Sequence, residues 1–200
     1  MHFVLIRHGQ TDWNASGRWQ GQADPPLNDA GRAQARQTAL ELTSQKIGAL
    51  VSSDLFRARE TAEIIAGQFG LRVEVDPRLR EVNLGDWQGL YSDEIRARWP
   101  EQMKQWLEAP LAVRPPNGES IQQLAARVLA AVNDIAARYP DRPVAVVAHE
   151  LPIAIILCRV KGIPLKDLRA HIPPNAVWQL VEWQERLPDI SRSTDRRNGW

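Results

Sequence analysis

The chain has 200 residues, of which 44% are apolar and 24% charged, a composition typical of one globular domain and not of a disordered or fibrous chain. Its formal net charge is +1, so a general electrostatic attraction to nucleic acid or to a membrane surface is not expected. The predicted partners are therefore small molecules. The sequence leaves open whether the protein is a monomer or a homodimer.

The apolar runs of the sequence do not indicate export or membrane insertion. The N-terminal apolar run, residues 3–6, turns polar at Arg7 and is shorter than the core of a signal peptide. The run at 151–158 falls well below the ~20 residues that span a bilayer. We therefore expect a soluble, cytoplasmic protein. Its single cysteine, Cys158, excludes an internal disulfide and is predicted to be a buried, unreactive thiol.

Strand and helix patterns alternate along the chain. The expected strands cover residues 3–6, 49–51, 71–75, 144–148 and 176–183. The expected helices cover residues 32–45, 55–69, 120–138 and 151–160. Asn28 or Asp29 can cap the first helix, and residues 52–54 are expected to cap the second. A polar stretch at 7–29 is predicted to be a loop.

This alternation predicts a three-layer α/β/α sandwich around a mostly parallel central sheet. The segment 78–118 carries aromatic residues and four prolines, which favour short helices and loops, so we expect a small helical cap insertion at about 89–118. One domain is predicted over residues 1–187. The remaining tail, residues 188–200, is expected to be poorly ordered.

Two histidines occupy equivalent places in the predicted sheet. His8 directly follows the first strand, and His149 directly follows the strand at 144–148. Ligands of parallel α/β sheets bind at the carboxyl ends of the strands, so neighbouring strands would bring both imidazoles into one crevice. Arg7 lies beside His8, and Gly9 allows a ligand to approach the backbone closely. A lone histidine at a strand end is usually structural, but this pair favours chemistry.

Arg57 is predicted in the first turn of a helix that also begins at the carboxyl end of a strand. A cation there opposes the helix dipole, which suggests that an anion binds nearby. The alternative is a surface arginine that pairs with Glu60 or Asp54. Spacing alone does not decide between these two interpretations.

A proton donor is expected in the segment 80–87, which contains Glu81 and Asp86 near a glycine turn. A partly buried carboxyl group there can have its pKa tuned by its neighbours. Glu81 is the stronger candidate and Asp86 its local competitor. Either residue could instead be an ordinary solvated carboxylate of a turn.

The sequence lacks a P-loop, a G-x-S-x-G elbow, an H-E-x-x-H motif and a cluster of metal-binding residues. A neutral imidazole can attack phosphorus, since its usual pKa of ~6.5 leaves it largely unprotonated near neutrality. Two arginines and a protonated second histidine would neutralise the phosphate charge. No metal is predicted. A metal hydrolase that uses His8, His149 and Glu81 has no supporting ligand motif.

At this point the sequence resembles the histidine phosphatase superfamily, also called phosphoglycerate mutase-like. Seven segments match in the family's order and extend over the chain to about Pro164. They are residues 5–14 (LIRHGQTDWN), 18–21 (RWQG), 26–31 (PLNDAG), 53–62 (SDLFRARETA), 79–89 (LREVNLGDWQG), 116–120 (PNGES) and 146–149 (VVAH). One such motif would be modest evidence, but this many in one order are specific.

The resemblance implies a metal-independent phosphomonoester hydrolase that needs no cofactor and acts on a small phosphorylated metabolite. His8 would become phosphohistidine, and the phosphoryl oxygens would be held by Arg7, Arg57 and His149. Glu81 would protonate the leaving oxygen and then deprotonate water. The substrate pocket would be lined by Asn14, Gln20, Gly21 and Glu150.

One position departs from the family pattern. The histidine that corresponds to His149 is usually followed by glycine, whereas Glu150 stands here. Its amide can still bind phosphate, but its carboxylate would lie near an anion. Two further functions stay open: a cofactor-dependent phosphoglycerate mutase, for which the segment after Glu81 looks short, and a non-catalytic phospho-ligand binding protein.

Five tryptophans lie in or beside the expected site loops, either as a wall over the substrate or, as we favour, as core and cap packing. They are Trp13, Trp19, Trp87, Trp99 and Trp106.

Overall fold

The computed structural model describes residues 1–184, so the tail predicted at 188–200 lies outside the described residues. Its centre is a five-stranded sheet in the order β3-β2-β4-β1-β5. The strands are β1 (His2–Arg7), β2 (Ala49–Ser52), β3 (Val73–Val75), β4 (Val144–Ala148) and β5 (Trp178–Glu182). Strands β1 to β4 run parallel, and β5 pairs antiparallel with β1. The predicted mostly parallel sheet is confirmed.

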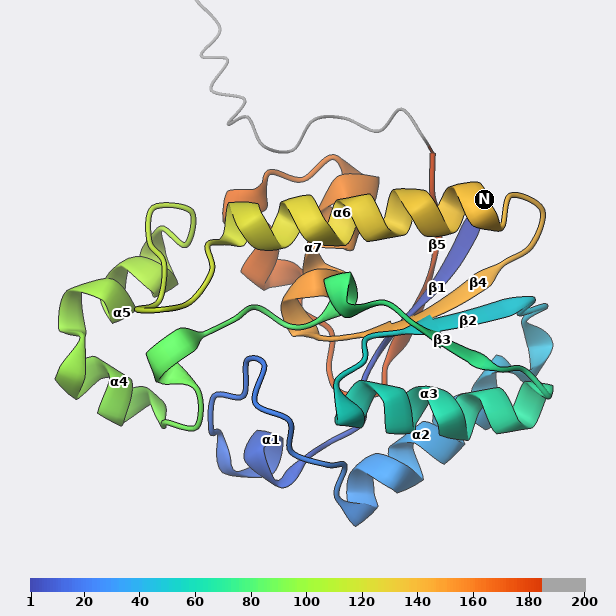
Figure 1. The fold of residues 1–200 in the computed structure, drawn as a ribbon, viewed down its shortest axis with the longest axis horizontal. Coiled ribbons are helices and arrows are strands. Elements are labelled where there is room, and N and C mark those ends of the chain that lie inside the picture. Colours follow the sequence, from blue (N-terminus) through green and yellow to red (C-terminus); the bar gives the residue numbers. More distant parts are fainter. Residues whose placement is uncertain (185–200) are drawn as a thin grey trace, which may run out of the picture.

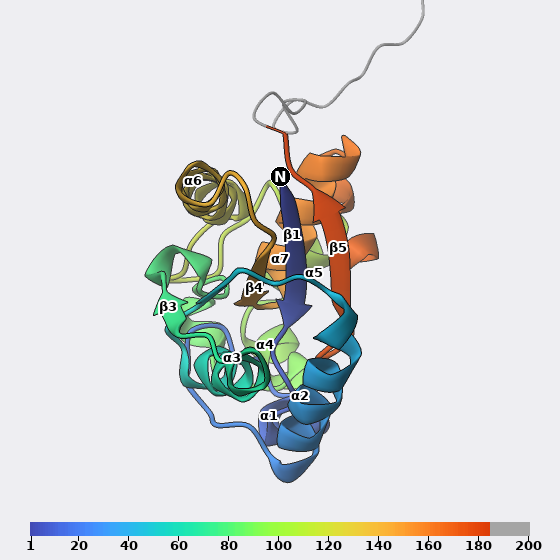
Figure 2. The ribbon, with the colours of Figure 1, turned by 90° about the vertical axis from the view of Figure 1, so that its right-hand side faces the viewer.

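Helices cover both faces of this sheet (Figures 1 and 2). The α-helices are α1 (Asp12–Ser16), α2 (Asp29–Glu41), α3 (Phe56–Phe69), α4 (Ser92–Arg98), α5 (Pro100–Glu108), α6 (Ile121–Arg138) and α7 (Glu150–Lys161). Short 3₁₀ helices are η1 (Leu42–Ser44), η2 (Pro77–Leu79), η3 (Gly85–Trp87) and η4 (Leu165–His171). Helix α1 lies in the stretch that was predicted to be a loop. Thr11 caps it, and the side chain of Asn14 accepts in return from the Thr11 amide.

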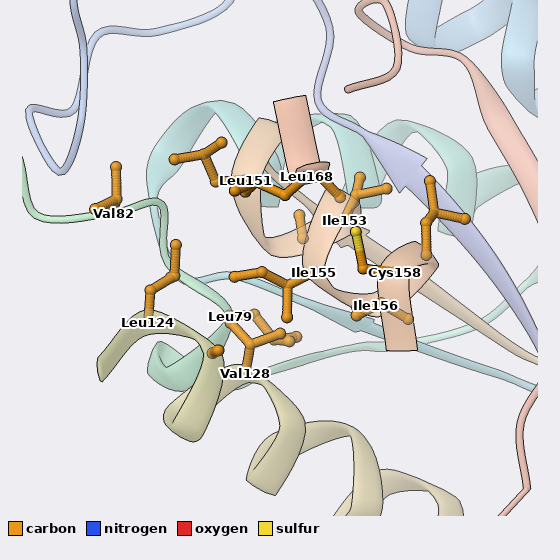
Figure 3. Packing of buried hydrophobic residues seen from close by; sticks show 14 of the residues in the cluster. Leu79, Val82, Leu124, Val128, Leu151, Ile153, Ile155, Ile156, Cys158 and Leu168 are labelled. Carbon is orange, nitrogen blue, oxygen red and sulfur yellow. The ribbon is translucent and has the colours of Figure 1, made fainter. Parts of the chain in front are cut away.

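Alternate strand residues face opposite layers, because successive side chains of a strand point to opposite sides. On β1, Phe3 and Leu5 belong to the apolar cluster that includes α6 and α7, whereas Val4 and Ile6 pack with α2 and α3. Figure 3 shows the first cluster, with the sulfur of Cys158 among aliphatic side chains. Cys158 is buried as predicted, and burial raises the pKa of its thiol to about 11. The predicted three-layer sandwich is confirmed.

The carboxyl ends of β1, β2 and β4 meet at one edge of the sheet, where the chain turns into α1, α3 and α7. The loop after β1 packs directly on the start of α2. A Cβ atom on Gly9 would lie 2.5 Å from the Gly31 carbonyl oxygen, so only glycine permits this backbone contact. Helices α4 and α5 lie together away from the sheet, at the left of Figure 1.

Candidate active site

His8 and His149 are neighbours, as the sequence predicted. In the β1–β4 register Arg7 is opposite Ala148, so the two histidines leave adjacent strands at the same level. Their ring centres lie 5.1 Å apart. The His8 amide donates to the Ala148 carbonyl at 3.0 Å, which fixes the loop after β1 on the end of β4.

The His8 side chain is buried and held in one orientation. Its Nδ1 lies 2.7 Å from the Gly9 carbonyl oxygen, a partner that requires the proton on Nδ1. The lone pair is then on Nε2, which accepts from Arg57 Nε at 3.2 Å. Burial, followed by the charges of Arg57 and Arg7, holds the pKa of His8 well below its usual value. The free site therefore contains a neutral imidazole with an available nitrogen.

Arg57 belongs to this site and is not a surface arginine. Its side chain is 1% exposed, and its two terminal nitrogens donate to the carbonyls of Ala23 at 2.7 Å and Gly21 at 2.8 Å. Glu60 and Asp54, the alternative partners, pair with other arginines. The backbone of Gly21 thus orients a cation beside His8.

The start of α3 differs from the predicted cap. Residues 52–54 do not cap it: the N-cap is Leu55, which makes no side-chain cap bond. The Phe56 amide instead donates to the carboxylate of Asp24, at 2.6 Å, in a distant loop. Asp54 is engaged elsewhere because Arg80 binds both of its oxygens.

His149 is fully buried behind His8, at the N-cap of α7. Its Nε2 lies 2.9 Å from Ser53 Oγ, while Nδ1 is buried without a partner among the described residues. Burial and the nearby charge of Arg57 hold the pKa of His149 well below its usual value. In the free site these causes, burial first, favour a neutral His149, whereas the predicted protonated form concerns the site with phosphate bound.

Arg7 forms an ion pair with Glu150, the first residue of α7. Its Nη1 donates to the Pro173 carbonyl at 2.6 Å, and its Nη2 contacts the Glu150 carboxylate at 2.9 Å. Its Nε is buried without a partner among residues 1–184. The carboxylate of Glu150 lies in the pocket lining and offsets part of the charge of Arg7.

Glu81 lies in the pocket, and Asp86 does not. Glu81 is 8% exposed, and its Oε1 accepts from the Val82 amide at 2.8 Å. Burial, and secondly the negative charge of Glu150, raise the pKa of Glu81 to about 7. Asp86 is exposed and accepts from the Asn117 side chain at 3.1 Å. Glu81 therefore has the burial and the pKa of a proton donor near neutrality, whereas Asp86 lies outside the pocket lining.

An amide network supports the loop after β1. Thr11 Oγ1 donates to Gln20 Oε1 at 3.0 Å, and the Thr11 amide donates to Asn14 Oδ1 at 3.1 Å. Asn175 Nδ2 donates to the His8 carbonyl at 3.1 Å and lies 3.4 Å from the same Asn14 oxygen. Sequence reasoning missed Asn175, because the turn at 173–175 carries no local sign of its contact with residue 8.

These residues surround a pocket of about 340 Å³. Every predicted site residue except the buried His149 lines it: Arg7, His8, Asn14, Gln20, Gly21, Arg57, Glu81 and Glu150. Three tryptophans also line it, namely Trp13, Trp19 and Trp106. The packing interpretation is confirmed for Trp87 and Trp99, and the fully buried ring of Trp87 lies edge-on to those of Trp19 and Trp106.

Residues 1–184 contain no group of three or more His, Cys, Asp or Glu side chains placed to bind a metal ion. Within the same residues, no helix combines the length and the apolar character needed to cross a bilayer.

Comparisons with known proteins agree with this geometry. The family model of the histidine phosphatase superfamily (branch 1) matches residues 3–196. Phosphoserine phosphatase 1 of Hydrogenobacter thermophilus is 32% identical over 92% of this chain and 87% of its own. A Yersinia pestis protein named "probable phosphoglycerate mutase" is 35% identical over 92% and 86%.

A solved structure is similar as well. Mycobacterial glucosyl-3-phosphoglycerate phosphatase in complex with VO3 has a TM-score of 0.82 and 39% identity, and the match covers 90% of each chain. The resemblance seen in the motifs is confirmed. The chain belongs to the histidine phosphatase superfamily, in branch 1.

Proposed function

We propose that this histidine phosphatase hydrolyses phosphomonoesters of small metabolites by passing the phosphoryl group to His8 Nε2 and then to water, without a metal ion. The observation that carries the proposal is the state of His8. Its Nδ1 is anchored on the Gly9 carbonyl, its Nε2 lone pair lies beside Arg57 in the pocket, and its pKa is lowered. Such an imidazole is a nucleophile at neutral pH.

In the first step, His8 Nε2 attacks phosphorus while the bond from phosphorus to the leaving oxygen breaks. Protonated Glu81 donates its proton to that oxygen, so the alcohol leaves neutral and Glu81 becomes a carboxylate. The ring then carries a positive charge, and the Gly9 carbonyl stabilises it by accepting from Nδ1. In the second step, Glu81 takes a proton from water, the water oxygen bonds to phosphorus, the N–P bond breaks and inorganic phosphate leaves.

The negative charge of the phosphoryl group would be stabilised by N–H donors of the pocket. Arg7 Nε and His149 Nδ1 are buried without partners among residues 1–184, and Arg57 Nε already faces the reacting nitrogen. Arg7 Nε and His149 Nδ1 can bind phosphoryl oxygens at little reorganisation cost, and Arg57 Nε would exchange its bond to His8 Nε2 for such an oxygen. If the Ser53 hydroxyl donates a hydrogen bond to His149 Nε2, the proton of the neutral imidazole is on Nδ1, as this role requires.

Four residues would line the substrate around these donors: Asn14, Gln20, Gly21 and Glu150. The substrate class is proposed from the pocket's size and from the names of relatives, which are phosphatases of phosphoserine and of glucosyl-3-phosphoglycerate. These are small phosphorylated metabolites.

The test is His8→Ala, which should abolish turnover while leaving the circular dichroism spectrum unchanged. Brief mixing of the wild-type protein with ³²P-labelled substrate should trap an acid-labile, base-stable phosphoenzyme, and the variant should trap none. His171→Ala is the matched control, since His171 lies in η4 and does not line the pocket. Full activity in His8→Ala would refute the mechanism, and activity that requires a divalent cation after EDTA treatment would refute metal independence.

The mutase remains the second candidate because one relative bears that name. A mutase must keep water from the phosphoenzyme, and here α4 and α5 alone make up the helical part of residues 89–118. Feeding 3-phosphoglycerate and measuring inorganic phosphate and 2-phosphoglycerate separates the two. Phosphate should dominate. Excess 2-phosphoglycerate would establish the mutase instead, and failure of any phosphoester to react would favour a binding protein.

A further inference from the structure

Arg169 lines the pocket but has no role in the mechanism above. It lies in η4, where its Nη2 donates to the Trp106 carbonyl at 3.0 Å and its guanidinium lies 5.5 Å from the centre of the Trp106 ring. These two contacts hold the side chain in place. Its Nε is buried without a partner among the described residues, and within that part of the chain no ion pair includes it. Arg169 therefore contributes to the pocket lining a guanidinium that is held in place and has an N–H group without a partner among residues 1–184.

The net charge of the pocket also favours a ligand with more negative charge than one phosphate group. Four guanidinium groups and two carboxyl groups line it: Arg7, Arg18, Arg57, Arg169, Glu81 and Glu150. When Glu81 is protonated, as the first step requires, a phosphate dianion still leaves one positive charge uncompensated. Pockets bind ligands whose charge complements their own. A substrate with one more negative charge satisfies this condition.

Arg18 is a weaker candidate for that charge than Arg169. Its guanidinium lies 5.3 Å from the Trp13 ring centre and 5.0 Å from that of Tyr91, and it donates to the Tyr91 hydroxyl at 3.4 Å. Two aromatic rings thus already contact the Arg18 guanidinium. Arg169 has one aromatic neighbour and free N–H groups, the arrangement that suits a carboxylate.

We infer that Arg169 binds a second anionic group of the substrate, a carboxylate, so that the preferred substrates are phosphomonoesters of small hydroxy acids. The inference rests on the proposed phosphatase activity. The phosphoryl group would lie at His8, and the carboxylate would lie toward η4 and the Trp106 end of α5. The competing role for Arg169 is purely structural, as a counter-charge to Glu150, whose negative charge reaches it.

The test compares 3-phosphoglycerate with racemic glycerol 3-phosphate, which replaces the carboxylate by a hydroxymethyl group and keeps a primary leaving alcohol. Wild-type kcat/KM should favour 3-phosphoglycerate by about 10- to 100-fold, the range expected for a hydrogen-bonded ion pair. Arg169→Met should reduce that ratio to near one. Arg96→Met, at an exposed arginine of α4 paired with Asp93, should keep the wild-type ratio.

The outcomes are distinguishable. If Arg169→Met lowers kcat/KM for both esters equally, Arg169 supports the site only structurally and the inference is wrong. It is also wrong if Arg18→Met, and not Arg169→Met, removes the preference, or if the wild-type protein shows none. Turnover of p-nitrophenyl phosphate separates these results from failure of the proposed function, because a protein that cleaves none of the three esters is not a phosphatase.

Discussion

Replacing Glu81 by glutamine removes an ionisable proton while keeping the shape of the side chain. At pH 7 a carboxyl group with a pKa of about 7 is about half protonated, whereas one with the ordinary value of 4.5 is protonated in about one molecule in 300. The buried environment therefore makes the acid form available at neutral pH. Because the group is active when protonated, its contribution is complete below pH 7 and is lost as the pH rises.

The expected effect depends on the leaving group. An alkyl phosphate releases a strongly basic alkoxide that needs the proton, so Glu81→Gln should slow its hydrolysis by about 10² to 10⁴-fold. p-Nitrophenolate leaves without a proton, so phosphohistidine formation from p-nitrophenyl phosphate should slow much less. Since phosphoesters also titrate near pH 6, the quantity to plot is the wild-type kcat/KM divided by that of the variant for one ester. This ratio should fall above pH 7.

Two other carboxyl groups provide the controls. Asp86→Asn alters an exposed carboxylate outside the pocket lining, and Glu150→Gln alters one inside it. Asp86→Asn should show no dependence on the leaving group, and Glu150→Gln should show only the smaller one that follows from a lowered pKa of Glu81. If one of them shows the full dependence and Glu81→Gln does not, the proton donor has been misassigned, although His8 could still be the nucleophile.

Three further predictions concern the surroundings of the site. Glu150→Gln removes a negative charge near Glu81, so the pKa of Glu81 should fall and the alkaline loss of kcat/KM should move to lower pH by about one pH unit. Ser53→Ala removes the hydroxyl bonded to His149 and should lower kcat by up to about 10²-fold, with Ser53→Thr restoring part of it. Gly31→Ala places a Cβ against a backbone carbonyl of the loop after β1, and should lower the free energy of unfolding in urea by about 1–3 kcal/mol.

The pairing of His8 with His149 could be predicted on the condition that their two strands are neighbours, which the pairing of β1 with β4 fulfils. Both residues directly follow buried runs, and parallel strands place their carboxyl ends at one edge. The place of Arg57 could not be predicted in this way, because residue spacing did not decide between an anion-binding arginine and a surface arginine. The decision came from residues far away in sequence, the Gly21 and Ala23 carbonyls, which no local pattern around residue 57 reveals.

Contacts between distant loops account for three further features that the sequence did not predict. Asp24 caps α3 in place of residues 52–54, and Asn175 reaches the His8 carbonyl from the turn before β5. Each contact depends on how the loops after different strands converge above the sheet. Arg169 belongs to the same class, since only the packing of η4 on Trp106 brings it to the pocket.

Glu150, at the position where the resemblance implies glycine, would act on both steps of the proposed reaction. Its contact with Arg7 offsets one cation of the phosphate site, which weakens the binding of substrate and of inorganic phosphate alike. Its charge also raises the pKa of Glu81, which keeps the proton donor loaded near neutral pH. The better acid lowers the barrier of the chemical step, whereas the weaker binding changes kcat only to the extent that the transition state does not share it. A glycine at this position would retain phosphate more tightly and require a lower pH for the same proton donor.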